Sequence, residues 1–337
     1  MILSIRGCEA RPLSAAMVAA RAFIGVSVVT LEYFNTGWIC ILGGFVLALP
    51  LALIIDLPGK GRFVAGTRCR KLAWALVFAL AIYECTALTR LILKSTLYCG
   101  LDQLQPLGTT LVTLAFCGLM AVKNGRGLGN GARIWGIVFL VLFSLVVLSQ
   151  VENFQFYWLF PILGPGVRSL ARGCLETAGV LAGAMTPLLF REDETGGKHC
   201  ALRSLSAGCA VATALCLYEA LMSPSLAMGS ASQISVLDAL LANGRASLAL
   251  MLPMVVLWFT GVFATLNGYG FTGAAVLQGM TGLDGRVCVW GAMGLILILT
   301  LTGISSRKWF HIVEMGEYLL AICAASLLRI GKRRASP

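Results

Sequence analysis

Charged residues are scarce in this sequence. Asp, Glu, Lys and Arg make up 12% of its 337 residues, whereas hydrophobic residues make up 58%. Soluble domains carry about 25% charged residues, so the composition excludes an ordinary soluble protein. Apolar runs close to the roughly 20 residues that a helix needs to cross a bilayer recur along the whole chain. The sequence therefore predicts an all-α polytopic membrane protein, with residues 1–337 forming a single integral membrane domain.

Residues that hold metals or perform catalysis are also scarce. There are two histidines and no C-x-x-C pair, and most of the twelve cysteines lie inside apolar runs, where cysteine behaves as a small hydrophobic residue. His199-Cys200 is half of a metal site at most, and a solvated pair is the preferred interpretation. Gly125 to Gly129 lacks the preceding strand and the spacing of a phosphate-binding loop. We see no H-E-x-x-H motif or Ser/His/Asp set, so we expect no metal, no cofactor and no enzyme activity.

Ten apolar segments are long enough, or nearly so, to be membrane spans. We expect helices at about 13–31, 37–55, 72–93, 107–122, 134–149, 169–190, 202–222, 246–267, 287–304 and 313–328. The net charge of +11 could suggest a nucleic-acid partner, but the basic residues fall in loops on alternate sides of these spans. If the N-terminus is cytoplasmic, inner segments hold eighteen Lys and Arg and outer loops hold five. The positive-inside rule then places both termini in the cytoplasm.

The sixth span is broken by residues that disfavour a helix. Ser169 to Phe190 contains Gly179, Gly183 and Pro187, and such breakers are tolerated in a membrane where the loosened backbone lines a cavity. We expect an interruption from Gly179 to Gly183, where freed N–H groups would face an anionic group of a ligand. The G-x-x-x-G spacing also suits close helix packing, and that alternative stays open.

Ten spans divide into two halves of five. An odd number of helices in each half reverses the orientation of the second half, which is the inverted-repeat plan of many transporters. The repeats would cover about 13–150 and 169–329, so the first helix is the partner of the sixth. Gly25 lies near the middle of the first helix, and we expect helices 1 and 6 both to be interrupted.

Three motifs resemble a known family. Leu159 to Gly166 (LFPILGPG) resembles the L-x-P-x-L-x-x-G signature of the GerAB-type spore germinant-receptor B subunits. Gly127 to Arg133 is similar to the family's G-L-x-x-x-A-R motif before helix 5. Asn243-Gly244-Arg245 and the segment from Trp258 to Phe263 are similar to its helix 8 pattern. The chain departs from the family at Met17, where a glutamine is usual.

The resemblance implies a fold and a biological setting. The family belongs to the amino acid–polyamine–organocation transporter superfamily. A member would be a subunit of a germinant receptor in the inner membrane of a spore. It would recognise a nutrient, often an amino acid, alongside a larger membrane subunit and a lipoprotein subunit.

Two charged residues are expected near the middle of the bilayer. Arg21 and Glu84 lie about 12 and 18 Å from the inner edge at 1.5 Å per helical residue. An unpaired charge at that depth costs about 2.5–3.5 kcal/mol on insertion scales, so we predict that they pair. A static structural pair and a role in ligand or ion coupling are equally weighted. Arg172 and Glu176 are one helical turn apart and are expected to pair within the sixth span, with direct contact of Glu176 with a ligand as the alternative.

Other charged residues are placed by their distance from the helix ends. Arg90, Arg172, Glu219, Glu314 and Glu317 lie close enough to those ends to reach the interface, and we expect them to be solvated or to snorkel. The candidate ligand-binding residues come from helices 1, 3, 6 and 8, with Trp258 and Tyr83 as an aromatic wall. They are Gly25, Ser27, Tyr83, Glu84, Thr177, Ala178, Gly179, Gly183 and Trp258.

Three functions are compatible with this reading. The first is a receptor subunit that binds a nutrient and changes state, which its partner subunits detect. The second is an amino-acid permease driven by protons or sodium, since fold alone does not settle function. The third is a membrane scaffold with a degenerate pocket.

Overall fold

Helices form most of the chain in the computed structural model, and no strand occurs among the residues described. The structure describes residues 9–21, 36–56, 68–98, 106–122, 125–159, 166–190, 199–222, 248–302, 316, 319 and 321–323. Residues 9–21 are helical and are called the N-terminal helix below. The remaining helices are α2 (Gly37–Asp56), α3 (Arg68–Tyr98), α4 (Pro106–Val122), α5 (Gly125–Gln150), α6 (Val167–Ala184), α7 (Cys200–Met222), α10 (Leu248–Thr281) and α11 (Gly285–Leu301). Short 3-10 turns follow α5, η2 (Val151–Asn153) and η3 (Phe156–Leu159), and α6, η4 (Thr186–Phe190).

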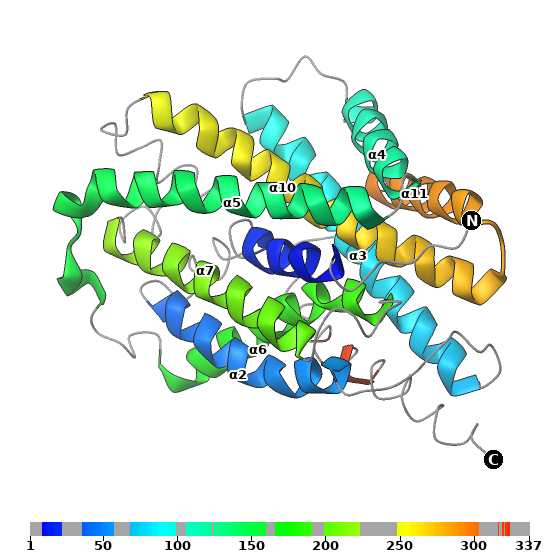
Figure 1. Ribbon diagram of the computed structural model, residues 1–337, viewed down its shortest axis with the longest axis horizontal. Coiled ribbons are helices and arrows are strands. Elements are labelled where there is room, and N and C mark those ends of the chain that lie inside the picture. The colour runs from blue at the N-terminus through cyan, green and yellow to red at the C-terminus, as the bar shows by residue number, and fades with distance from the viewer. Residues whose placement is uncertain are drawn as a thin grey trace.

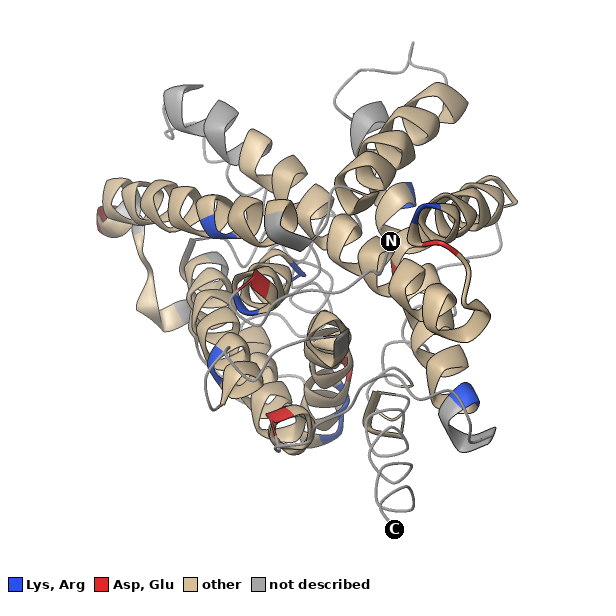
Figure 2. Cartoon of the chain, turned by 45° about the vertical axis from the view of Figure 1, so that its right-hand side comes forward, with Lys and Arg blue, Asp and Glu red and all other residues tan. Residues whose placement is uncertain are grey.

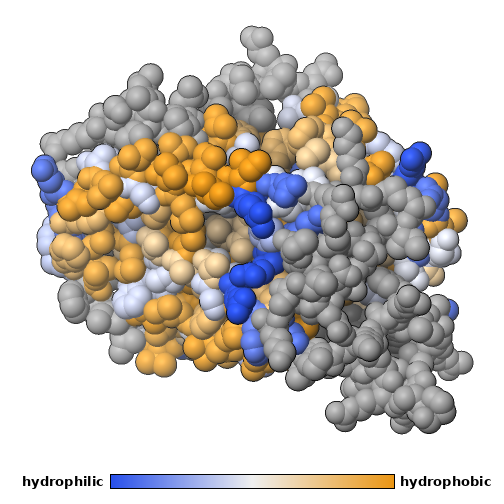
Figure 3. Space-filling view, in the orientation of Figure 1, coloured by the Kyte–Doolittle hydropathy of each residue, from blue (hydrophilic) through white to orange (hydrophobic). Residues whose placement is uncertain are grey.

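The apolar surface agrees with a membrane protein. Among the described residues, four helices are long and apolar enough to cross a bilayer: Gly37–Asp56, Lys71–Leu93, Gly127–Ser149 and Cys200–Tyr218. Few charged residues lie along the described helices, as Figure 2 shows. Large apolar side chains are exposed instead, including Ile134 and Leu148 on α5, and apolar residues cover much of the described surface in Figure 3.

The helices pack as two groups. The α2 group comprises the N-terminal helix, α2, α6 and α7, within which α2 packs along both α6 and α7, while η4 lies between α6 and α10. The α3 group comprises α3, α4, α10 and α11, with α10 packed along α3 and α11, and α11 also packed against α4. In Figure 1 the N-terminal helix (dark blue) lies between α7 below it and α5 and α10 above it. Helix α5 packs against α10, and its Phe143 ring contacts Tyr218 of α7 at a centroid distance of 5.8 Å.

Small residues allow the closest approaches between helices. A Cβ atom added at Gly44 of α2 would lie 2.8 Å from the Cβ of Thr177 on α6. A Cβ at Gly118 of α4 would lie 2.8 Å from the Trp290 ring of α11. Glycine at these positions lets the backbones approach as they do in other membrane helix pairs.

Three of the predicted spans agree closely with the observed helices. Spans 37–55, 107–122 and 202–222 match α2, α4 and α7 to within two residues. The prediction for α5 was wrong at its start, because the helix begins at Gly125 and not near Ile134. The prediction for the eighth span was wrong at its end, because α10 continues to Thr281 through a stretch expected to be an inner loop. Both stretches are rich in glycine, which membrane helices accept: Gly129 of α5 lies against Glu9, and Gly268 of α10 lies against Met17.

Candidate functional site

The interruption of the sixth span lies after the predicted one. Helix α6 runs without a break through Gly179 and Gly183 and ends at Ala184, so the expected opening at Gly179 to Gly183 is wrong. The helix stops there because Pro187 has no N–H to donate to the carbonyl of Gly183, four residues earlier, and its ring would clash with that carbonyl. The hydroxyl of Thr186 donates to the Gly183 carbonyl at 2.8 Å in place of the missing N–H.

The end of α6 is joined to the N-terminal helix. Ser14 Oγ donates a hydrogen bond of 3.1 Å to the carbonyl of Ala184, the last residue of α6. Both side chains are fully buried. This bond supplies a partner to a carbonyl that the helix terminus would otherwise leave without one, which is costly inside a membrane. The freed backbone groups at this break are carbonyls bonded within the protein, not the N–H groups expected to face an anion.

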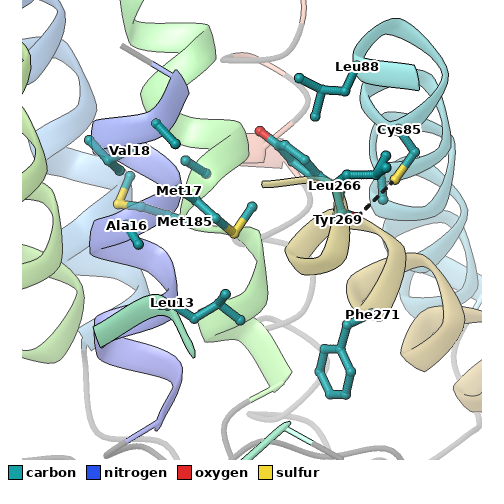
Figure 4. Close-up of a cluster of buried hydrophobic side chains, with 14 of the residues drawn as sticks. Leu13, Ala16, Met17, Val18, Cys85, Leu88, Met185, Leu266, Tyr269 and Phe271 are labelled. Atoms are coloured by element: carbon teal, nitrogen blue, oxygen red, sulfur yellow. Dashed lines mark hydrogen bonds between the residues drawn. The ribbon is translucent and has the colours of Figure 1, made fainter. Parts of the chain in front are cut away.

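The N-terminal helix is buried on most of its surface. Leu13, Met17, Val18 and Ala20 are each at most 1% exposed. Figure 4 shows Leu13 and Met17 on this helix, with Leu266 and Tyr269 of α10 and Leu88 of α3 across from them. The helix therefore occupies the centre of the molecule, at the contact between the two groups.

The predicted Arg21–Glu84 pair is present at this contact. Arg21 Nη2 donates to Glu84 Oε1 at 2.7 Å, and the two side chains are 4% and 0% exposed. The pair joins the N-terminal helix to α3 across 63 residues of sequence. Glu84 Oε2 has no hydrogen-bond partner within the described part of the chain. Removing one partner of a buried pair typically costs about 3–5 kcal/mol, because the other charge is left without compensation.

The pair predicted within α6 is also present, but in a different environment. Arg172 Nε donates to Glu176 Oε1 at 2.7 Å, one helical turn away. The Arg172 side chain is 47% exposed, whereas Glu176 is buried. Solvent or lipid headgroups can therefore reach one end of this pair.

The other candidate ligand-binding residues are spread over several contacts. Thr177 and Ala178 lie against Gly44, which places them at the α2–α6 interface and not beside Glu84. Trp258 is 2% exposed and packs edge-on against Phe259, with ring centroids 5.1 Å apart. Tyr83 is partly buried on α3 next to Glu84.

Some predictions fall outside what the structure describes. Gly25 and Ser27 lie outside the described residues, and so does the predicted interruption of the first helix. For the same reason Glu314 and Glu317 are not placed, and the side chain of Glu219 is not described.

Two further polar residues join helices in ways that the sequence did not indicate. Asp56, at the end of α2, accepts hydrogen bonds from the N–H groups of Ala201 (2.8 Å) and Leu202 (2.9 Å) at the start of α7. Ser204 Oγ of α7 donates to the Arg11 carbonyl at 3.1 Å. Such caps satisfy helix termini, and only the position of Asp56 directly after an apolar run could have suggested it.

Arg90 has a structural partner, so the expectation that it is simply solvated was wrong. Its guanidinium donates to the carbonyls of Leu299 (2.7 Å) and Thr300 (3.2 Å) at the end of α11. A cation at a helix C-terminus is favourable because the last carbonyls concentrate negative charge. Arg90 therefore fixes α3 to α11 within the α3 group.

Neither a metal centre nor a disulfide occurs among the described residues. No group of three or more His, Cys, Asp or Glu side chains there could hold a metal ion. The nine cysteines whose side chains are described form no disulfide, and all but Cys174 and Cys323 are buried, as expected of small apolar residues. No known protein-family model matches the chain, and no curated protein sequence matches it.

Proposed function

We propose that this chain is a multi-pass membrane protein built from two inverted repeats of five helices, and that it binds a small solute where the N-terminal helix meets η4, α3 and α10. The observation that carries this proposal is the end of α6 at Ala184, bonded to Ser14 of a buried N-terminal helix. Breaks in membrane helices at the centre of a repeat interface are where transporter-type proteins bind their ligands.

The pattern of helix pairing supports the repeat. Counting five helices further along the chain relates α2 to α7, α3 to α10 and α4 to α11. The two helices of each pair are in direct contact. The contact of α2 with α6 has its counterpart in the contact of α7 with the N-terminal helix, where Gly208 lies against Val18. The contact of α3 with α11 has its counterpart in that of α10 with α4. Two equivalent halves would produce this correspondence.

The biological role follows from the sequence resemblance. We propose a membrane subunit of a spore germinant receptor, in the cell membrane or spore inner membrane with both termini in the cytoplasm. The solute would be a nutrient, with an amino acid as the first choice. Its binding would change the relative stability of two states of the fold, and a larger membrane subunit and a lipoprotein subunit would respond.

A permease is the second candidate, and Glu84 favours it. A buried carboxylate with one oxygen lacking a partner among described residues could exchange a proton or a cation during a transport cycle. In that case the isolated protein would move solute without partner subunits.

Two measurements test the proposal. Thermal unfolding of the purified protein in detergent, with each of the twenty amino acids added in turn, should give a rise in Tm for one or a few of them. Uptake of that same radiolabelled amino acid into liposomes then separates the candidates, since a receptor subunit binds without accumulation and a permease accumulates it. A chain that gives no shift with any amino acid contradicts solute binding of this class.

A further inference from the structure

Two cysteines meet where α2 packs along α6 (Figure 1). Cys40 Sγ lies 4.0 Å from the carbonyl oxygen of Leu170. In a helix that carbonyl points at the N–H of the residue four positions on, which is Cys174. The thiols of Cys40 and Cys174 lie within hydrogen-bonding reach of each other. One turn further along α2, a Cβ atom added at Gly43 would collide with Cys174 Sγ, so the two helices are in close contact here.

The side chain of Cys40 is directed at α6 and not at α7, the other neighbour of α2. Cys40 packs against Leu170 of α6, whereas the next residue, Ile41, packs with Cys216 of α7. The cysteine of α7 therefore lies on the other side of α2. Of these two neighbouring cysteines, the one that Cys40 faces is Cys174.

The two facing thiols differ in access from outside the protein. Cys40 is fully buried, whereas Cys174 is partly exposed. Arg172 lies two residues before Cys174, about 3 Å back along the helix axis, and its charged side chain is 47% exposed. A charged side chain that is open on this scale marks the level of water or lipid headgroups. A dissolved reagent can therefore reach Cys174 but not Cys40.

One accessible thiol beside one buried thiol suits thiol–disulfide exchange with a low-molecular-weight disulfide. The Cys174 thiolate attacks one sulfur of that disulfide, whose S–S bond breaks, and one small thiol leaves. The Cys40 sulfur then attacks Cys174 Sγ in the mixed disulfide, and the second small thiol leaves. The protein loses two electrons and two protons, and the small disulfide gains them as it becomes two thiols.

We propose that Cys40 and Cys174 form a redox site, which a low-molecular-weight disulfide oxidises to a disulfide bond between α2 and α6. Cys174 is the attacking residue and Cys40 is the resolving residue. Cys40 lies near the start of α2, and Cys174 lies in the first half of α6. In the orientation proposed above both helices begin on the outer side, where oxidising conditions let disulfides persist. The site needs no solute, so its failure and the failure of solute binding are separate results.

The chain contains a matched control pair. Cys85 of α3 and Cys117 of α4 are also neighbours, but both side chains are fully buried. This second pair offers the same chemistry without an accessible thiol. If access to Cys174 starts the reaction, the control pair should stay reduced.

Oxidised glutathione is the probe for this site. The purified full chain is reduced in detergent, freed of reductant and incubated with oxidised glutathione. Remaining thiols are then blocked with N-ethylmaleimide, and disulfide-linked peptides are quantified by mass spectrometry. We expect the Cys40–Cys174 link to form at least about tenfold faster than the Cys85–Cys117 link, because reaction follows access of the thiol. Glutathione attached to Cys323, which is exposed, shows that the reagent is active.

Serine variants separate the two roles. Cys40→Ser should keep glutathione on Cys174 as a lasting mixed disulfide, because no neighbouring thiol displaces it. Cys174→Ser should leave Cys40 unmodified, because the buried thiol is not reached. Glutathione on Cys40 in that variant would overturn the assigned order.

The wild type alone also decides the proposal, whether or not a variant folds. A lasting glutathione adduct on Cys174 without the linked peptide would show that Cys40 cannot resolve it, and this would overturn the pairing. No reaction at Cys174 while Cys323 reacts would do the same. Equal rates for the two cysteine pairs would show that oxidation follows unfolding of the protein, and this also contradicts a built site.

Discussion

The centre of the molecule and the outer part of α6 each contain an arginine–glutamate pair with the same 2.7 Å separation. Arg21–Glu84 joins two helices, and its side chains are 4% and 0% exposed. Arg172–Glu176 lies within one turn of one helix, and its arginine is 47% exposed. The pairs are alike in chemistry and distance and differ in what surrounds them and in what they connect.

This difference teaches that the distance between two charges says little about their role. At an exposed site water solvates each charge when the pair opens, so such pairs contribute about 0–1 kcal/mol. At a buried site nothing replaces the lost partner, and the cost of breaking the pair rises to several kcal/mol. The central pair should therefore decide the arrangement of helices, and the α6 pair should not.

The largest expected effect is the loss of one central partner. Glu84→Ala should destabilise the protein by about 3–5 kcal/mol, because Arg21 is left charged in a buried site. Chemical unfolding in detergent, followed by tryptophan fluorescence, measures the change. The double variant with Arg21→Ala should lose clearly less than the sum of the two single losses, and strict additivity would contradict an energetic coupling between them.

A smaller effect is expected from filling the space between helices beside the central pair. Gly208→Ala should cost about 1–3 kcal/mol, because the new methyl group meets the branched Val18 side chain and the backbones must move apart. Gly268→Ala on α10 is the matched control, because Gly268 faces the other side of the N-terminal helix, where the flexible end of Met17 can move. Equal losses of unfolding free energy in the two variants would contradict the difference expected between the branched Val18 side chain and the flexible Met17 side chain.

The stability contributed by a charged residue that caps a helix can be measured at Asp56. Asp56→Ala should destabilise the protein by about 1 kcal/mol, within the 0.5–2 kcal/mol usual for a lost N-cap, because the N–H groups of Ala201 and Leu202 lose their acceptor. Asp56→Asn keeps one acceptor oxygen and should recover part of the loss. Thermal unfolding of the three proteins side by side gives the comparison, and a loss as large as that of Glu84→Ala would break the ranking.

The smallest effect is expected at the α6 pair. Arg172→Ala should change the free energy of unfolding by about 0.3–1 kcal/mol, because the arginine end of the pair is open to solvent. Added salt should weaken this pair further, and the wild type and the variant should converge in stability as salt is raised. A loss of several kcal/mol would show that the buried Glu176 carboxylate depends on Arg172 as Glu84 depends on Arg21.

The sequence predicted those features that follow from the cost of burying polar groups. Long apolar runs indicated α2, α4 and α7, and the depth of Arg21 and Glu84 in two such runs indicated that they pair. Pro187 indicated an interruption of the sixth span, because a missing N–H is visible in the sequence. The predicted interruption lay too close to the N-terminal end of the span. Gly179 and Gly183 were treated as helix breakers, whereas only Pro187 ends the helix.

Features that depend on which surfaces meet were not predictable in the same way. Nothing local distinguishes Ser14 from any other small polar residue in a helix, and its role depends on the position of Ala184, 170 residues away. Arg90 was expected to be solvated because its depth was known and its neighbour α11 was not. Likewise, whether Gly268 ends a helix or faces a neighbour depends on the presence of Met17 opposite it.

Helix α10 has a further consequence because of its length. Its 34 residues extend over about 51 Å, while the hydrocarbon core of a bilayer is about 30 Å thick. Its C-terminal portion contains Tyr269, Phe271 and Val276, which are fully covered by protein. A tilt of α10 by about 5° around Gly268, where it meets the N-terminal helix, displaces the two ends of α10 by roughly 2 Å. A small rotation where the solute is proposed to bind becomes a movement of atomic size at the opposite surface.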